Sequence, residues 1–163
     1  MKVSATMVFV TDNHSRFLIW SILDIFAYSS RIRVILQQKR MEGPNVSKVA
    51  IILHATEAEK GRAIHSLVYA QELHEAGHEV KLIFDGQGVL WINKFEEPSH
   101  MMNPLFKAVK KLGVVEACGH CANSFNVTKE VEQANVSFSK DINAEEHTSI
   151  AVLVTNGWQI ITL

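Results

Sequence analysis

The sequence predicts an α/β fold with a mostly parallel sheet, and three observations lead to this prediction. Short apolar segments alternate with helical segments from residue 46 to residue 163, and short turns separate them. The first apolar segment, residues 48–54 (KVAIILH), is nearly continuous. A strand has this composition when helices cover both faces of its sheet, which is the usual state of a parallel sheet. Strands that alternate with helices therefore indicate a sheet covered on both faces.

Clear local signals predict the first helix and the second strand. Thr56 and Glu59 have the spacing of a capping box, in which two side chains accept hydrogen bonds from the backbone amides at the start of a helix. Apolar residues then recur at spacings of three and four through residues 63–73, and Gly77 ends the helix. Residues 79–84 form the second predicted strand.

The remaining elements are predicted in the same way. Residues 85–88 form a turn, and Pro104 opens a helix that ends at Gly113. Further strands are expected at residues 114–117, 136–138 and 158–163, and further helices at residues 89–92, 122–127, 128–134 and 144–155. These elements together make one predicted domain, residues 46–163.

Residues 1–45 differ from the rest and form an N-terminal extension. The apolar run at residues 17–28 contains Asp24 and falls short of the ~20 apolar residues that a membrane-spanning helix needs. It also lacks the cleavage site of a secretory signal. We expect the extension to be poorly ordered, or helical and packed on a neighbouring subunit. A second interpretation is that the natural chain starts at Met41 and that the preceding residues are not native.

The composition argues against several classes of function. The 16 basic and 17 acidic residues nearly balance, so nucleic acid is not an expected partner. The shortness of the apolar run at residues 17–28 likewise makes a membrane an unexpected partner. Two cysteines are too few for a disulfide framework, and we expect a cytoplasmic protein. The motifs GxGxxG, GxxxxGK(S/T) and GxSxG are missing, which leaves dinucleotide, P-loop and serine hydrolase functions without support. We expect no cofactor.

The strongest chemical signal is the pair of cysteines in residues 117–122 (ACGHCA). Cys118 follows the third predicted strand, at the edge where open parallel sheets bind ligands. A helix that begins there presents free amides, which favour a thiolate over a thiol. His120 could add positive charge or move a proton, and Gly119 lets a substrate approach the backbone. Cys118 and Cys121 are thus the candidate catalytic residues.

Four interpretations of this segment stay open. A thiolate can accept a sulfane sulfur and pass it on, while the second cysteine resolves the product by forming a disulfide. The pair could instead be a dithiol reductase, or two buried side chains in an oligomeric binding protein. It could also be half of a zinc site, for which His54 or a partner subunit would supply ligands. We assign no metal, because a second CxxC is missing.

Two residues that follow other strands could line the same crevice. His54 ends the first predicted strand, and Asp85 follows the second. Both are candidate binding residues, although we favour a structural role for His54 and a turn before Gly86 for Asp85. The tryptophans Trp91 and Trp158 are expected in the core or at a subunit interface. Five other histidines are expected to be solvated: His65, His74, His78, His100 and His147.

Several segments of the chain occur together in one known family. They are residues 48–54, LIFDG at 82–86 with Gly88 and Trp91, PLF at 104–106, CGHCA at 118–122 with Phe125, and GWQIIT at 157–162. In these features the chain from residue 48 to residue 163 resembles the DsrE/DsrF-like family, and within it the small single-domain prokaryotic members with a CxxCA segment.

The resemblance implies a three-layer α/β/α sandwich with a five-stranded parallel sheet, which is a flavodoxin-like architecture. It also implies a homo-oligomer, a trimer or a hexamer, that works with sulfur donor and acceptor proteins. Those members that are close to DsrE carry sulfur as a persulfide on one strand-end cysteine, which corresponds to Cys118. Cys121 stands where those members usually have a small residue. The resemblance therefore implies a sulfur-relay protein, sulfurtransferase-like if it is an enzyme.

Overall fold

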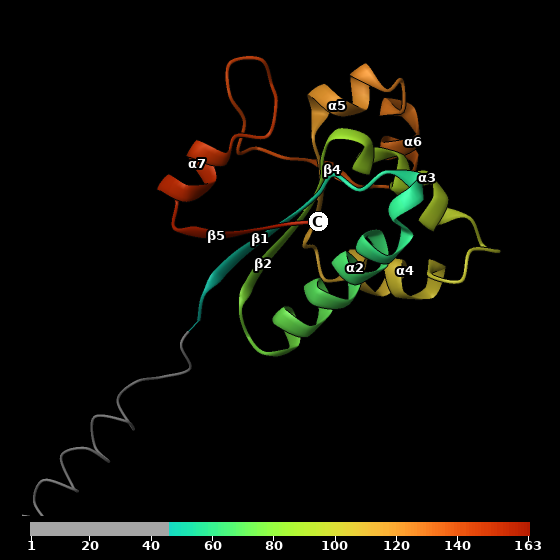
Figure 1. Cartoon of the computed structure of the whole chain (residues 1–163), viewed down its shortest axis with the longest axis horizontal. Coiled ribbons are helices and arrows are strands. Elements are labelled where there is room, and N and C mark those ends of the chain that lie inside the picture. The colour runs from blue at the N-terminus through green and yellow to red at the C-terminus, as the bar shows by residue number, and fades with distance from the viewer. Residues whose placement is uncertain (1–45) are drawn as a thin grey trace, which may run out of the picture. The chain divides into compact units, whose positions relative to one another are not determined.

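A five-stranded parallel sheet forms the centre of the protein (Figure 1). The computed structural model describes residues 46–163, so the predictions for residues 1–45 lie outside the described part. The strands are β1 (Lys48–Leu53), β2 (Glu79–Phe84), β3 (Val115–Ala117), β4 (Ser137–Phe138) and β5 (Trp158–Thr162). The helices are α2 (Lys60–Glu75), α3 (Leu90–Glu96), α4 (Asn103–Lys111), α5 (Gly119–Ser124), α6 (Thr128–Gln133) and α7 (Ile150–Thr155), with short 3-10 turns η1 (Glu57–Glu59) and η2 (Gly86–Val89).

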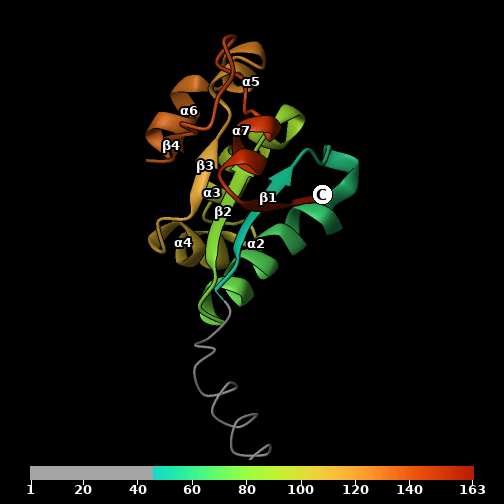
Figure 2. The same ribbon diagram turned by 90° about the vertical axis from the view of Figure 1, so that its left-hand side faces the viewer.

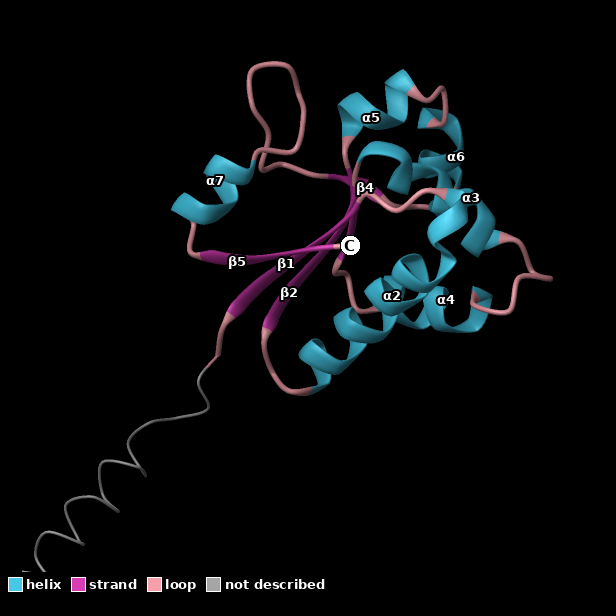
Figure 3. Ribbon diagram, in the orientation of Figure 1, coloured by secondary structure: helices cyan, strands magenta, loops and turns pink. Residues whose placement is uncertain are grey.

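The chain crosses the sheet in one direction and then reverses. The strand order is β4-β3-β2-β1-β5, and all neighbouring strands are parallel. Each connection from β1 to β4 moves one strand further, whereas the last connection returns across the sheet to the far side of β1. Because such crossovers are right-handed, the reversal moves the connecting helix to the opposite face. Helices α2 to α6 accordingly lie on one side of the sheet and α7 on the other (Figure 1, Figure 3).

The two faces of the sheet are covered unequally. Val49, Ile51 and Leu53 of β1 pack in the larger core, which helices α2 to α6 close, while Ala50 and Ile52 pack in a smaller core with α7. Because β1 is buried on both faces, its sequence is a continuous apolar run. Figure 2 shows α7 as a single short helix in front of the sheet. The predicted α/β/α sandwich is confirmed, with one thick and one thin helical layer.

Other local predictions are also confirmed. Thr56 and Glu59 form the capping box, and α2 follows it. Trp91 and Trp158 are buried, and the indole N–H of Trp91 donates to the Ala55 carbonyl at 2.9 Å. Within residues 46–163, the helices are too short or too polar to cross a membrane.

The last helix is where the predicted boundaries differ most from the structure. Helix α7 begins at Ile150 rather than at residue 144, because the Ser149 side chain accepts a hydrogen bond from the Val152 amide and caps the helix there. The preceding residues, 139–149, lie mostly outside helices and strands and connect β4 to α7. This difference moves His147 from a predicted helix into a loop that follows the carboxyl end of a strand.

Gly88 lies where η2 passes close to β1, and a Cβ at this position would collide with the Leu53 carbonyl. We expect Gly88→Ala to lower the free energy of unfolding by about 1–3 kcal/mol or more, because backbone atoms cannot easily give way. Gly61→Ala in α2 is the matched control, since a Cβ there meets nothing within 4 Å. Urea denaturation measures both variants, and equal stabilities would contradict the close approach.

Candidate functional site

Three candidate residues directly follow three neighbouring strands. His54 follows β1, Asp85 follows β2 and Cys118 follows β3, and these strands lie side by side. The hydrogen-bond ladder of the sheet continues through them. The Asp85 amide donates to the Leu53 carbonyl and the Cys118 amide to the Phe84 carbonyl, both at 2.9 Å. The structure thus brings all three residues to one edge of the sheet, the edge where parallel sheets usually bind ligands.

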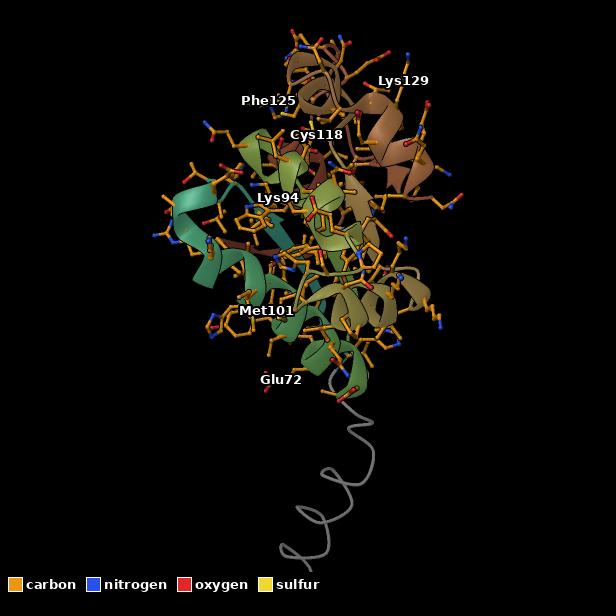
Figure 4. All side chains as sticks on the ribbon, turned by 90° about the vertical axis from the view of Figure 1, so that its right-hand side faces the viewer. Glu72, Lys94, Met101, Cys118, Phe125 and Lys129 are labelled. Carbon is orange, nitrogen blue, oxygen red and sulfur yellow. The ribbon has the colours of Figure 1, made fainter. Side chains whose placement is uncertain are left out.

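Cys121 lies in the first turn of α5, immediately beyond Cys118. Both cysteines are buried, both are free thiols, and the side chain of Cys118 (labelled in Figure 4) is fully enclosed. The Cys121 thiol donates a hydrogen bond to Oδ1 of Asp85 at 3.0 Å. The helix that begins after Cys118 therefore turns the second sulfur back toward the carboxylate that follows β2.

A loop from the edge strand covers the cysteine pair. We call residues 139–149, between β4 and α7, the strap. Asp141 anchors the strap through an ion pair with Lys81 of β2, at 2.6 Å between Oδ2 and Nζ. An isolated antiparallel bridge joins Ile142 to Thr148 and closes the strap into a short loop. The ion pair ties the start of the strap to the middle of β2, and the bridge holds the two ends of the loop together.

His147 of the strap contacts both sulfurs. Its Nδ1 lies 3.7 Å from Sγ of Cys118, and its Nε2 lies 3.6 Å from Sγ of Cys121. The Asn143 side chain accepts a hydrogen bond from the His147 amide, which fixes the backbone at this point. The prediction that His147 is solvated is therefore wrong: its side chain is 38% exposed, and the ring lies against the cysteine pair.

The amide and the imidazole beside Cys118 come from the strap rather than from the cysteine segment. The Cys118 side chain makes no capping hydrogen bond to α5, and the Thr148 amide donates to its sulfur at 3.4 Å. The exposed ring of His120 packs on the His147 ring, with 5.2 Å between centroids, and its Nδ1 lies 3.1 Å from the Glu145 carbonyl. His147 thus takes the position that the sequence suggested for His120.

Asp85 is the centre of the hydrogen bonding at this edge. Burial raises the pKa of Asp85, but hydrogen bonds from His54, Cys121 and the Gly86 amide outweigh burial and hold that pKa well below its usual range. Oδ2 lies 3.1 Å from Nε2 of His54, and Oδ1 accepts from the Gly86 amide at 2.8 Å. Asp85 therefore begins a turn, as predicted, and also holds a thiol and an imidazole.

The buried carboxylate changes the proton affinity of both partners. Burial and the hydrogen bond to Asp85 both raise the pKa of the Cys121 thiol. The hydrogen bond to Asp85 also raises the pKa of His54, although partial burial of the ring opposes this change. Cys121 is consequently held as a neutral thiol, and His54 is biased toward its cationic form.

A pocket of about 450 Å³ opens beside the cysteine segment. Gly119 and His120 lie in its wall, together with Phe138 and Ser139 from the end of β4 and with Glu145 from the strap. A Cβ on Gly119 would meet the Phe138 ring at an ordinary contact distance of 3.8 Å, so the glycine leaves the pocket wider but is not required by a clash. Both predicted binding residues of the cysteine segment thus border a space open to other molecules.

Comparison with known proteins identifies the family. A sequence model of the DsrE/DsrF-like family matches residues 47–163. The chain belongs to this family. A relative in Methanocaldococcus jannaschii, named as an uncharacterized protein, is 32% identical over 120 residues, which cover 71% of this chain and 95% of the relative. No solved structure matches the chain. The resemblance drawn from the cysteine segment and the strand ends is therefore confirmed.

The pairing of His54 with Asp85 predicts a change in titration. Asp85→Asn removes the carboxylate, so we expect the pKa of His54 to fall toward its ordinary value of 6.5. NMR of the His54 ring as a function of pH measures this change. Glu132→Gln, which alters an exposed carboxylate elsewhere, is the control and should leave the His54 titration unchanged.

The sign of the linked stability follows from the direction of this change. Because the folded-state pKa of His54 is raised, the pair stabilises the fold fully below pH 6.5 and loses this contribution as pH rises through the folded-state pKa. The His54 side chain is half exposed, so the contribution is at most about 1 kcal/mol. An unchanged His54 pKa in Asp85→Asn would show that the two side chains are not paired in solution.

Proposed function

We propose that this member of the DsrE/DsrF-like family is a sulfur-relay protein that carries a sulfane sulfur as a persulfide on Cys118. The hydrogen-bond pattern of the two sulfurs is the observation that supports it. Sγ of Cys118 accepts an N–H from Thr148, whereas the Cys121 thiol donates its proton to Asp85. The thiolate is the nucleophile in sulfur transfer, and an N–H donor stabilises the charge on the sulfur that it faces, whereas Asp85 keeps the proton on Cys121. Cys118 is therefore the sulfur that reacts.

The tautomer of His147 gives Cys118 a second donor. Nδ1 of His147 lies 3.2 Å from the Thr148 carbonyl oxygen, which can only accept a hydrogen bond. This contact favours a proton on Nδ1, which also lies 3.7 Å from Sγ of Cys118. The strap thus places the Thr148 amide and the His147 imidazole beside Cys118, in place of the helix amides expected from the sequence.

The transfer step needs no oxidant. The Cys118 thiolate attacks the outer sulfur of a donor cysteine persulfide, and a new S–S bond forms between Cys118 and that sulfur. The S–S bond of the donor breaks, and the donor cysteine leaves as a thiolate with the electron pair. Cys118 then holds the persulfide, and attack on its outer sulfur by an acceptor thiolate regenerates the Cys118 thiolate.

Loading requires the strap to move. Cys118 is fully buried, and the donor sulfur must come within bonding distance of it. His147 and Thr148 are the strap residues in contact with the Cys118 sulfur, so their displacement exposes the nucleophile. Loops joined by few hydrogen bonds open locally at lower free-energy cost than the core. The homo-oligomer and the donor and acceptor proteins expected from the family stay predictions.

Mass spectrometry tests the assignment of the persulfide. After treatment of the whole protein with inorganic polysulfide, we expect a gain of about 32 Da on Cys118, one sulfur atom. Cys118→Ser should lose this adduct, and Cys121→Ser, whose hydroxyl can still donate to Asp85, should keep it. Circular dichroism checks that both variants fold. An adduct that persists in Cys118→Ser would overturn the assignment.

The rate of alkylation tests the role of the strap. Asn143→Ala removes the side-chain acceptor of the Glu145 and His147 amides, both at 3.0 Å, and should loosen the loop. We expect Cys118 in this variant to react with iodoacetamide several-fold faster than in the wild type, because local opening limits access. Lys140→Ala, at an exposed position of the same strap, is the control. Equal rates in all three proteins would mean that the strap does not control access.

A further inference from the structure

Four side chains of metal-ligating type meet at the carboxyl edge of the sheet. Asp85, Cys118, Cys121 and His147 each offer one ligand atom, and these atoms all lie within 4.8 Å of one another. They come from four places in the fold: the end of β2, the end of β3, the first turn of α5 and the strap. Three of the four residues are buried. The sequence suggested two of these ligands as half of a zinc site, and the fold supplies two more.

The distances suit a tetrahedral cation. With zinc bonds of about 2.0–2.3 Å, tetrahedral ligand atoms lie roughly 3.3–3.8 Å from one another. Nε2 of His147 lies 3.6 Å from Sγ of Cys121 and 3.8 Å from Oδ1 of Asp85. Sγ of Cys121 lies 3.0 Å from Oδ1 of Asp85, which must widen slightly when a cation replaces the thiol proton. These three ligand atoms therefore need shifts of about half an ångström or less, and the Cys118 sulfur, which lies within 4.8 Å of them, needs a shift of up to about one ångström.

Neighbouring groups orient two of the four ligands, His147 and Asp85. The contact between Nδ1 of His147 and the Thr148 carbonyl leaves the lone pair of Nε2 directed at Cys121 and Asp85. His54 holds the other carboxylate oxygen of Asp85. Metal-binding histidines and carboxylates in proteins are usually oriented by such partners. Two cysteines that were buried only as core side chains would need neither the contact of His147 with Thr148 nor that of His54 with Asp85.

We propose that Asp85, Cys118, Cys121 and His147 bind one thiophilic divalent cation, with zinc as the best fit. Two sulfur ligands favour zinc over magnesium or calcium, which prefer oxygen. Four protein ligands make a closed site of the structural kind rather than one with an open position for water. Both sulfurs bind the cation as thiolates, so any protons that they carry are released to solvent on binding.

Cation binding also has a consequence for sulfur transfer. A Cys118 thiolate that donates a lone pair to a metal is a weaker nucleophile, and with His147 also bound the strap keeps this sulfur buried, so we expect the metal-bound protein to load a persulfide more slowly than the metal-free protein. This consequence rests on the proposed function, whereas cation binding itself does not. The same two sulfurs would then serve either as metal ligands or as a sulfur-transfer pair, and His147 of the strap would belong to the metal-bound form.

Cobalt(II) is the probe for the site, because its visible absorption reports tetrahedral geometry and thiolate ligation. The whole reduced protein is treated with a chelator, freed of it and titrated with cobalt(II) and then zinc. We expect about one cobalt ion per chain, thiolate-to-cobalt charge-transfer bands, and displacement by zinc. A lack of stoichiometric binding, or an octahedral spectrum without thiolate bands, would overturn the proposal.

A matched pair of histidine variants tests the ligand set. His147→Ala should weaken zinc binding by at least about 100-fold, since loss of an outer-layer partner alone costs about 10–100-fold. His120→Ala removes the neighbouring ring, which is not in the ligand set, and should change affinity far less. Equal losses, or a loss only in His120→Ala, would show that His147 is not a ligand.

Comparison with the persulfide assay separates the two proposals. If His147→Ala loses cobalt binding but still gains a sulfur on Cys118, both the metal site and the relay are supported. If the wild type binds no cobalt but Cys118 gains a sulfur, the metal proposal fails alone. If cobalt binds at the four residues and polysulfide adds no sulfur to the metal-free protein, the relay fails and the metal site stands.

Discussion

The register of three adjacent parallel strands is the constraint on which the candidate site depends. Strands β1, β2 and β3 end together, so the residue that follows each one lies beside the next along a single edge of the sheet. His54, Asp85 and Cys118 occupy these positions. The pairing of Leu53 with Phe84, and of Phe84 with Ala117, aligns the three strand ends.

Asp85 links this edge to the cysteine pair. A buried carboxylate is costly unless donors surround it, and here a backbone amide, an imidazole and a thiol all bond to it. The carboxylate thereby fixes the side chain of Cys121 and keeps its proton in place. The two cysteines are consequently unlike each other, although they are only three residues apart: Cys118 accepts hydrogen bonds, and Cys121 donates one.

The strap determines what surrounds the two sulfurs. In the structure the strap places the His147 imidazole against both sulfurs, and Cys118 is buried beneath it. This arrangement supports the proposed metal site, since His147 completes a set of four side chains of ligating type. In the proposed relay the strap must move away and expose Cys118 beside the pocket. The two proposals therefore differ in the position of one eleven-residue loop, 139–149.

The sequence by itself determined the parallel sheet, with the five strands of residues 46–163 placed to within one residue at each end, and also the family. It placed His54, Asp85 and Cys118 at strand ends as well, because apolar runs and turn residues are local signals. It missed His147, although Thr148 and Ser149 before an apolar run already suggested a helix cap that would leave His147 in a loop. Only the tertiary structure decided which imidazole and which amide meet the sulfurs. Those contacts join residues about thirty positions apart, and no local pattern encodes them.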